Sequence, residues 1–406
     1  MPASKYSKLK NCMENAAEFR EVLSSLSESS KYKVLKQKRK KGETLLMRIA
    51  RDGYADTMQC IAESLSPGDF CKLLNKRDKY SFTPIHRAVG REQIATLKCV
   101  VDAVSPDDLY QLFSVCDKYG ETALHAAATS DHAEIVECIV NSMPPDKLCQ
   151  LLMVRAYKRH RFSCPGDTAL HRATEKGHIE FVKCMLSSVP VTDLDKLLKI
   201  VGEDGNTFVH MAAVEGLPEI IKHIAHLIPS TDFVGLFISQ NRSRKPVLHC
   251  AAEIQCAGQI ETLKCIIDSV PPDDLSKLLS VKDRDGDTAL HKAALGDRVE
   301  ALTCLVDAAV RVGHLSRVAI IANKRGNTVV HQTAKLKGHT EKLRYLLNNL
   351  STPDCLEILS LENFEDPYYT PLALAKSEKN FEAAFCIEEF LNKNEHTPQG
   401  KNVKLN

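Results

Sequence analysis

The sequence contains no tryptophan, and aromatic residues make up only 6% of its 406 residues. A hydrophobic share of 44% together with 26% charged residues is typical of a soluble folded chain, so we expect a core of Leu, Ile, Val and Ala. The formal net charge is only +2, which gives no overall attraction to nucleic acid or to an anionic membrane. Composition therefore argues against nucleic acid as a partner.

Long apolar runs and a secretory leader are also missing. No apolar run approaches the roughly 18 residues that would span a bilayer, and the polar start from Met1 to Tyr6 does not resemble a leader peptide. We therefore expect no membrane span and a cytoplasmic location. In a reducing cytosol the fifteen cysteines should be free thiols.

Motifs for catalysis are absent as well. The sequence has no Gly-x-Ser-x-Gly elbow, no P-loop, no Gly-x-Gly-x-x-Gly and no isolated cysteine with a supporting context. Acidic pairs such as Asp107-Asp108 fall where a helix should begin, which explains them without catalysis. We expect neither an enzyme nor a bound cofactor or metal.

What the sequence does contain is a short motif that recurs at a near-constant interval. In most copies the motif ends on a histidine, and the copies are spaced by 39, 46, 39, 39, 42 and 40 residues. These anchor histidines are His86, His125, His171, His210, His249, His291 and His331. Met47 and Ala373 hold the same position in two divergent copies. Such a period predicts an array of stacked units and not a domain built around one central site.

Each unit reads as a turn followed by two helices. In the copy that starts at Asp283, Gly286 suits a turn with positive φ, Thr288 can cap the next helix, and a second helix follows over residues 300–306. The same glycine recurs as Gly42, Gly120, Gly166, Gly205, Gly286 and Gly326, with Ser81, Arg244 and Tyr368 in its place elsewhere. The threonine recurs in every unit except one, where Pro246 replaces it.

A further segment after the second helix has its own signature. Ser105-Pro106-Asp107 and Thr352-Pro353-Asp354 are typical helix starts, because the hydroxyl caps, proline fixes φ and the carboxylate favours the positive end of the helix. We predict a short third helix in most units. The segment from Arg311 to Ile321 lacks this start and is the weakest case.

The phrases Thr83-Pro84-Ile85-His86 and Thr122-Ala123-Leu124-His125 resemble the signature of ankyrin repeats, over roughly residues 40 to 390. The period of 39 to 42 residues is longer than the family's usual length of about 33. The resemblance implies an all-α solenoid with hairpin tips. We expect a partial capping unit over residues 1–41 with a helix from Glu14 to Leu23, about nine repeats over 42–391, and a disordered tail over 392–406.

Histidine and cysteine each recur about once per repeat, and we call these two series ladders. They could suggest a metal site or disulfide bonds. Zinc ligands must converge to about 2 Å from one ion, whereas equivalent residues of stacked helices lie about 8–10 Å apart. The histidines therefore cannot share an ion, and the family resemblance implies a structural role within the turn. A second ladder of cysteines lies 13 residues after most anchors. The same spacing exceeds the roughly 7 Å limit for a disulfide, so we expect buried apolar residues there.

Two basic segments leave alternatives open. The run over residues 31–41 could be a nuclear-import signal or bind an acidic partner, or it could be a solvated end of the array. The 46-residue spacing before His171 places an extra basic segment over 155–161, with the aromatic residues Tyr157 and Phe162 in or beside it. This insertion is either a contact element or a tolerated surface loop.

The resemblance implies a protein-binding scaffold or adaptor, monomeric, that holds a partner of unknown identity on its turn tips and first helices. Tyr80 and Tyr119 precede the turn glycine position in adjacent units, and aromatic and arginine residues dominate interfaces. The predicted contact residues are Tyr80, Phe82, Lys118, Tyr119, Tyr157, Arg159, Arg161, Phe162, Arg284 and Arg325. The alternative is binding of nucleic acid or another acidic surface through the two basic segments.

Overall fold

A computed structural model describes residues 2–130, 132–158, 165–253, 256–364 and 368–394. Helices dominate these residues, and the extended pairing found among them is one isolated bridge between Gln240 and Pro246. The predicted all-α fold is confirmed. The chain divides into two compact halves, Met1–Glu203 and Asp204–Asn406.

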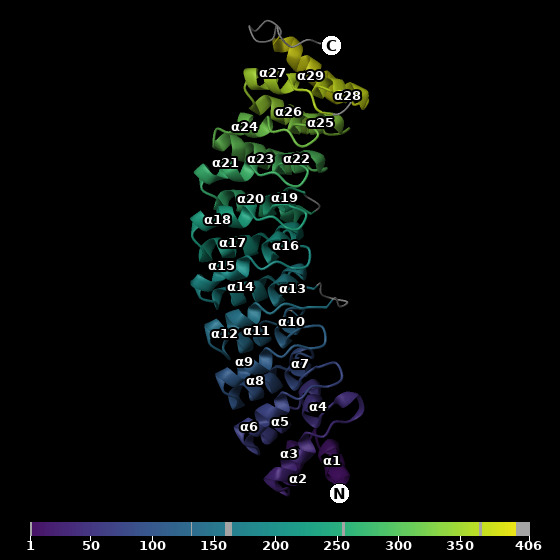
Figure 1. The fold of residues 1–406 in the computed structure, drawn as a ribbon, viewed down its shortest axis with the longest axis vertical. Coiled ribbons are helices and arrows are strands. Elements are labelled where there is room, and N and C mark those ends of the chain that lie inside the picture. The colour runs from purple at the N-terminus through teal and green to yellow at the C-terminus, as the bar shows by residue number, and fades with distance from the viewer. Residues whose placement is uncertain (1, 131, 159–164, 254–255, 365–367, 395–406) are drawn as a thin grey trace. The chain divides into compact units, whose positions relative to one another are not determined.

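In the amino-terminal half the repeats place their first, second and third helices in three columns (Figure 1). The leading segment contains α1 (Pro2–Asn11), α2 (Ala16–Ser24), α3 (Glu28–Leu35) and the short 3-10 helix η1 (Lys40–Gly42). The first helices are α4 (Leu45–Asp52), α7 (Pro84–Val89), α10 (Ala123–Ala127) and α13 (Ala169–Glu175). The second helices are α5 (Ala55–Glu63), α8 (Ile94–Ala103), α11 (Ala133–Val140) and α14 (Ile179–Ser187). The third helices are α6 (Pro67–Leu74), α9 (Pro106–Phe113), α12 (Pro145–Leu152) and α15 (Val191–Leu198).

The carboxy-terminal half repeats the three columns. Its first helices are α16 (Phe208–Glu215), α19 (Val247–Ala252), α22 (Ala289–Leu295), α25 (Val329–Lys335) and α28 (Pro371–Ser377). Its second helices are α17 (Pro218–Leu227), α20 (Ala257–Ser269), α23 (Val299–Arg311), α26 (Thr340–Asn349) and α29 (Phe381–Asn394). Its third helices are α18 (Ser230–Ile238), α21 (Pro272–Ser280), α24 (Leu315–Ala319) and α27 (Thr352–Ser360).

The turn and cap residues act as the sequence predicts. All six glycines of the turn series have positive φ, between 71° and 90°, and their substitutes Ser81 and Arg244 also have positive φ, at 65° and 56°. The first helices begin at the recurring threonine, for example Thr83 and Thr328, whose hydroxyl oxygen accepts the backbone N–H of the anchor histidine. The sequence period therefore fixes both ends of the hairpin tip that precedes each first helix.

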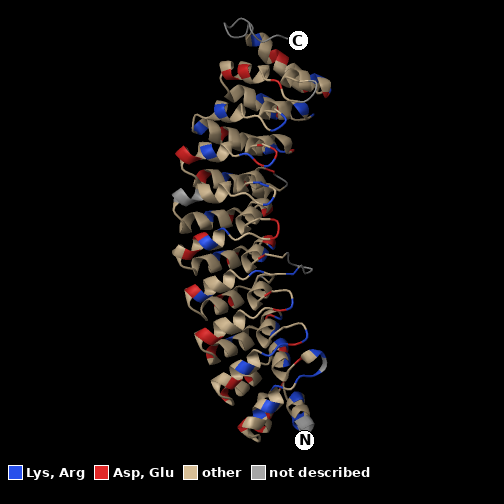
Figure 2. Cartoon of the chain, viewed as in Figure 1, with Lys and Arg blue, Asp and Glu red and all other residues tan. Residues whose placement is uncertain are grey.

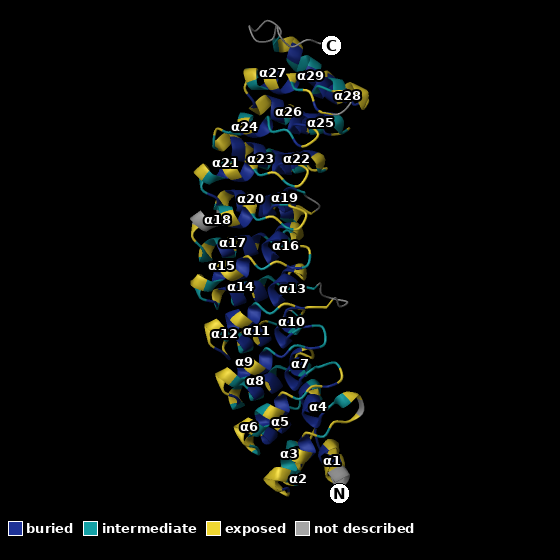
Figure 3. Cartoon of the chain, in the orientation of Figure 1, coloured by how far each residue is buried: buried dark blue, intermediate teal, exposed yellow. Residues whose placement is uncertain are grey.

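The core is aliphatic and continuous within each half, because equivalent helices of successive repeats pack on one another. Helix α4 packs on α7, and α5 packs on α8; in the other half α17 packs on α20. Figure 3 shows the buried residues along these contacts and the exposed ones on the outer turns. The largest fully buried aromatic side chains include Phe19, Phe113 and Phe208.

The additional helices differ in detail from the predictions. Among the described residues a third helix is present in every repeat except the last, and α24, which lacks the Pro-Asp start, spans only five residues. Helix α27 is capped by Ser351 and not by Thr352. The leading segment contains three helices, with α2 capped by Asn15, so its helix begins later than Glu14. Helix α29 reaches Asn394, so the predicted tail boundary at residue 392 falls inside this helix; residues 395–406 lie outside the described residues.

Candidate binding surface

The anchor histidines link neighbouring repeats. The Nδ1 atom of His86 accepts the backbone N–H of Thr83 at 3.3 Å, and the Thr83 hydroxyl lies 2.8 Å away. A backbone N–H can only donate, so the proton of the neutral ring is on Nε2, which donates to a backbone carbonyl of the next repeat. For the histidines from His86 to His331, except His171, these acceptors are the carbonyls of Glu121, Asp167, Ser239, Asp287, Asn327 and Tyr369.

Burial keeps these rings neutral. It lowers the pKa of His86, His125, His210 and His249 to about 4. Both ring nitrogens of a typical anchor are engaged in structural hydrogen bonds, which leaves no lone pair for an acid, a base or a metal. The prediction that the ladder is structural is consistent with this geometry, which also extends the role beyond the turn to the neighbouring repeat.

His249 departs from the pattern. Pro246 stands where the other repeats have threonine, so it offers neither a hydroxyl nor a backbone N–H. The Nδ1 atom of His249 is buried without a hydrogen-bond partner, while Nε2 still donates to the Asp287 carbonyl at 2.9 Å. This position carries an unsatisfied acceptor.

Four of the hairpin tips are held by an Asp or Asn whose role was not predicted from the sequence. The Oδ1 atom of Asp78 accepts the backbone N–H groups of Tyr80 and Phe82 at 2.7 and 3.0 Å. Asp117, Asp283 and Asn323 do the same in their own tips. The signal was present in the sequence, since these residues lie eight positions before their anchor histidines.

Successive tips are joined by backbone hydrogen bonds. Lys79 N–H donates to the Lys41 carbonyl at 2.9 Å, and Lys118 N–H donates to the Tyr80 carbonyl at 3.1 Å. Tyr157 N–H donates to the Tyr119 carbonyl at 3.0 Å. The tip residues of the amino-terminal half therefore form one row, and Lys and Arg recur along it (Figure 2).

The structure brings four of the predicted contact residues together on this row. The Nζ atom of Lys118 lies 4.7 Å from the ring centre of Tyr80 and 4.6 Å from that of Tyr119. The rings of Tyr80 and Phe82 are 6.3 Å apart. Tyr80 also contacts a second lysine, because the Nζ atom of Lys79 lies 4.5 Å from the centre of its ring. Lys79 lowers the pKa of Tyr80. Tyr80, Phe82, Lys118 and Tyr119 are half-buried, whereas Lys79 is exposed.

Tyr157 continues the row and, among the predicted aromatic residues that the structure describes, is the most exposed, at 57%. Its hydroxyl donates to the Asp117 carbonyl at 3.1 Å, and a Cβ at Gly120, where φ is +87°, would lie 2.2 Å from the Tyr157 ring. Gly120 thus makes room for the ring. Arg159, Arg161 and Phe162 lie outside the described residues.

The two remaining predicted residues belong to the carboxy-terminal half. Arg284 is exposed on its tip. Arg325 is also exposed and, with Lys324, Gln332 and Lys335, lines a groove of about 430 Å³ between α22 and α25. In this groove Lys292 is bound by Asp283 and Asp287, both at 2.8 Å, so its charge is matched locally.

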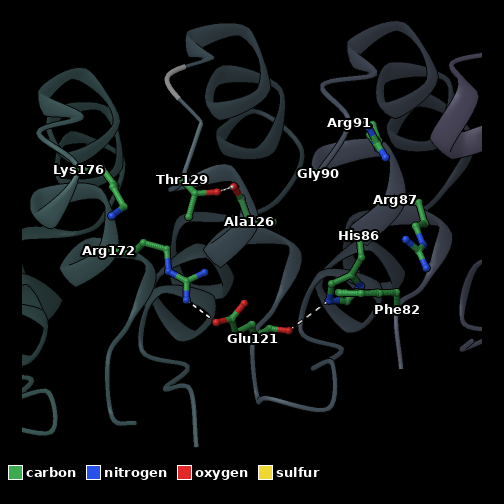
Figure 4. Close-up of a pocket in the computed structure, with 10 residues that line it drawn as sticks. All are labelled: Phe82, His86, Arg87, Gly90, Arg91, Glu121, Ala126, Thr129, Arg172 and Lys176. Atoms are coloured by element: carbon green, nitrogen blue, oxygen red, sulfur yellow. Dashed lines mark hydrogen bonds and ion pairs between the residues drawn. The ribbon is translucent and has the colours of Figure 1, made fainter. Parts of the chain in front are cut away.

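We call the row of Tyr80, Phe82, Lys118, Tyr119 and Tyr157 the aromatic row. A pocket of about 510 Å³ opens beside it, on the first helices α7, α10 and α13. Figure 4 shows its ten lining residues, which are Phe82, His86, Arg87, Gly90, Arg91, Glu121, Ala126, Thr129, Arg172 and Lys176. We call the aromatic row and this pocket together the tip face. Phe82 belongs to both parts, and the Arg87 guanidinium lies 4.8 Å from its ring centre.

Two of the pocket's arginines are held by carboxylates. Arg172, only 3% exposed, pairs with Glu121 and donates to the His125 carbonyl at 3.4 Å. Arg87 pairs with the buried carboxylate of Asp78. The Nε atoms of both arginines are buried without an acceptor. This pocket was not predicted from the sequence.

The basic segments are partly engaged in internal contacts. Residues 31–35 belong to α3, where Lys31 donates to the Ser64 carbonyl at 3.5 Å, and the Arg39 guanidinium lies 4.2 Å from the Tyr6 ring centre. In the insertion, Arg155 donates to the carbonyls of Gly166 and Val201. Residues 159–161 lie outside the described part of the chain.

The cysteine ladder lies on the second helices. Its members range from buried, as at Cys60 and Cys386, to half-buried, as at Cys138, so the expected burial is only partly met. Burial raises the pKa of Cys304 to about 11, which disfavours the reactive thiolate. The described cysteines are free thiols, and the described residues contain no group of His, Cys, Asp and Glu suited to a metal ion.

Four exposed aromatic residues of the last repeat were not predicted. Phe364, Tyr368, Phe381 and Phe385 are between 65% and 72% exposed. The sequence did contain a signal for Phe385, since the equivalent positions in other repeats are polar, among them Lys98, Glu137 and Arg344.

The fold and the surface define a helical repeat protein with a hairpin-tip face. The family model described as ankyrin repeats (3 copies) matches residues 96–189, 143–233 and 248–355, more than half of the chain. The chain therefore belongs to the ankyrin repeat family. Ankyrin repeats generally mediate protein–protein interaction and are typically not enzymatic.

Protein ACCELERATED CELL DEATH 6 of Arabidopsis thaliana is 31% identical over 120 residues, which is 27% of this chain and 17% of that protein. The chain thus aligns with less than a fifth of this curated relative. Among solved structures, the ankyrin repeat domain of Bcl-3, titled a unique member of the IkappaB protein family, has a TM-score of 0.48 and 19% identity, covering 65% of this chain and 98% of that one. None of the helices in the described residues is long and apolar enough to cross a membrane.

Proposed function

We propose that this chain is a scaffold or adaptor that binds a partner protein on the tip face of its amino-terminal half. The observation that carries the proposal is the position of Lys118, whose ammonium lies between the rings of Tyr80 and Tyr119. Contacts of this kind contribute about 0.5–1 kcal/mol each at exposed sites. They hold the side chains in place before a partner arrives, so less side-chain entropy is lost on binding.

The backbone hydrogen bonds between successive tips support the proposal. Along the row, a backbone N–H of each tip donates to a backbone carbonyl of the preceding tip, so the tips hold one another in place and the row is a rigid platform. Tyrosine on a rigid platform offers a large contact area and a hydroxyl at low entropic cost, which is why it is frequent among interface hot spots. Non-catalytic recognition is the function that such a surface can perform.

The test is quantitative affinity purification of the full chain from its native cell, comparing the wild type with Tyr80→Ala/Tyr119→Ala. Each lost hot-spot side chain costs about 1–2 kcal/mol, so we expect recovery of the main partner to fall by at least about tenfold. The matched control is Tyr110→Ala on α9, where Lys147 lies 5.1 Å from the ring centre. It removes a tyrosine–lysine contact away from the tips and should leave recovery unchanged. Equal recovery with the double variant would refute the proposed surface.

A further inference from the structure

The pocket of the tip face exists because one residue is small. The residue directly after the anchor faces the same way in each repeat, and α10 has Ala126 there between Arg87 of α7 and Arg172 of α13. Other repeats place larger side chains at this position, namely Arg48, Met211, Cys250, Lys292, Gln332 and Leu374. Ala126 therefore leaves a gap between two long side chains, and the gap is the pocket.

The lining of the pocket combines an apolar floor with a basic rim. Phe82, Gly90 and Ala126 supply the apolar part. Four of the ten lining residues are Arg or Lys, and only Glu121 is acidic. Since Arg172 holds Glu121 and Arg87 holds Asp78, the cations open to a ligand are Arg91 and Lys176, both exposed at the edge. Lys176 has only an exposed contact of 3.3 Å with Glu175, which is worth little in water.

This lining selects for a ligand that is both acidic and apolar. A free inorganic anion would gain the rim but leave the floor uncovered, and a purely apolar side chain would leave the rim unmatched. The volume of about 510 Å³ lies within the roughly 300–1,000 Å³ of ligand pockets. Phe82 joins the pocket to the row of Tyr80 and Lys118, so a bound segment can continue from one to the other.

We propose that the pocket receives an acidic peptide segment of a partner protein. One aliphatic or aromatic side chain of the segment packs on Phe82 and Ala126, and an Asp or Glu of the segment pairs with Arg91 or with Lys176, which lie at opposite ends of the pocket in repeats two apart. This inference rests on the proposed function and names the chemistry of the partner. The acidic residue supplies direction and selectivity, and the apolar side chain supplies burial.

The experiment uses the full chain as bait for a phage-displayed library of random dodecapeptides. We expect enrichment of sequences with Asp or Glu next to Leu, Ile, Phe or Tyr. Synthetic copies of the enriched peptides are then titrated by fluorescence anisotropy against three variants. Ala126→Met fills the pocket with a side chain that Met211 shows to be compatible with this position, and Arg91→Glu/Lys176→Glu reverses the exposed rim without touching the ion pairs of Arg87 and Arg172.

Both variants should weaken peptide binding by at least tenfold. The matched control, Gln332→Met, makes the corresponding change in the groove of the carboxy-terminal half and should leave binding unchanged. Circular dichroism and a denaturation midpoint establish that each variant is folded. If Ala126→Met does not fold, the rim reversal, which changes two exposed side chains, decides the question.

Three results would overturn the pocket proposal. These are enrichment of neutral or basic peptides, unchanged binding of acidic peptides to both variants, and equally strong binding of oligonucleotides or anionic vesicles that is insensitive to Ala126→Met. The proposed function has its own readout, the loss of the partner with Tyr80→Ala/Tyr119→Ala. A partner lost with the tyrosines but indifferent to the pocket variants therefore refutes this inference alone.

Discussion

At the scale of the residue, the anchor histidine is defined by its two nitrogens. In repeats with the threonine, Nδ1 accepts from the cap residue of its own helix and Nε2 donates to the next hairpin. Each ring thus couples the start of a first helix to the neighbouring repeat. Protonation of Nδ1 would turn this acceptor into a donor facing a backbone N–H, so the link requires the neutral ring.

Stability should consequently fall in mild acid. Burial lowers the folded pKa to about 4 at His86 and His125 in one half and at His210 and His249 in the other, whereas the unfolded value is about 6.5. Between these values the unfolded chain binds more protons, so stability present above pH 6.5 is lost as the pH falls toward 4. From pH 7 to pH 5.5 we expect a loss of about 1 kcal/mol per histidine.

Urea denaturation at pH 7, 6 and 5.5, followed by circular dichroism, measures this effect. Ordinary carboxylates with pKa near 4 stay ionised over this range, so they contribute little to the slope. Midpoints that do not change between pH 7 and pH 5.5 would contradict the assignment of neutral, hydrogen-bonded rings.

The exception at Pro246 gives a second prediction. Pro246→Thr should stabilise the carboxy-terminal half by about 1 kcal/mol, because it supplies donors to the buried Nδ1 of His249, an unsatisfied acceptor that costs about 1–3 kcal/mol. The lost rigidity of proline offsets part of the gain. Pro246→Ala restores the backbone N–H without the hydroxyl and should give a smaller increase in the denaturation midpoint. A Thr variant no more stable than the Ala variant would count against the role of the hydroxyl.

At the scale of the element, helix α22 ends on a buried lysine from another repeat. Lys342 of α26 is 1% exposed, and its Nζ donates to the carbonyls of Ala293, at 3.0 Å, and of Gly296. The carbonyls at a helix end have no partner within the helix, so a cation there satisfies them and opposes the negative end of the dipole. Burial lowers the pKa of Lys342 to about 8, which leaves the ammonium charged at pH 7.

Replacement of this lysine tests its role as a cap. Lys342→Met should destabilise the carboxy-terminal half by about 1–3 kcal/mol, because buried carbonyls lose their donor and the relief of burying an ammonium compensates only in part. Arg344→Met on the same helix changes an exposed cation and serves as the control, with a shift below about 0.5 kcal/mol. The midpoint of chemical denaturation is the measurement. A Lys342→Met protein as stable as the control would show that the helix end needs no cation.

The helices and turns could be predicted from the sequence more easily than the hydrogen bonds between repeats. The caps at Thr83 and Thr328 and the positive φ at Gly286 follow from local chemistry, and the structure confirms them. The partner of each histidine in the next repeat is a backbone carbonyl, which any residue provides, so it leaves no trace in the sequence. Lys342 was missed because it looks like an ordinary charged residue of an outer helix until its burial is known.

The candidate site, too, could be predicted only in part from the sequence. The phase of the repeats predicted that Tyr80 and Tyr119 lie in adjacent tips, and the structure places Lys118 between their rings. The pocket depended on the small size of Ala126 relative to Arg87 and Arg172. That contrast is visible in the sequence only after the positions of successive repeats are compared with one another.

At the scale of the whole molecule, the repeats separate two kinds of residue. Those that recur build the array: the threonine caps the first helix, the turn glycine allows the positive φ of the hairpin tip, and the histidine donates to a backbone carbonyl of the next repeat. Those that vary from repeat to repeat give each stretch of the tip face its own chemistry, aromatic and basic in the amino-terminal half. The central claim of our account is that this variable stretch, and not the outer helices, contacts a partner protein.

Site-specific photo-crosslinking tests this claim most directly. A benzoylphenylalanine replaces Lys79 on the tip row or, in a parallel protein, the exposed Lys98 on the second helix α8. Both proteins are irradiated in the native cell, and covalent adducts are identified by mass spectrometry. We predict a discrete protein adduct from position 79 that is lost with Tyr119→Ala, and none from position 98. Adducts from position 98 with none from position 79 would contradict the account.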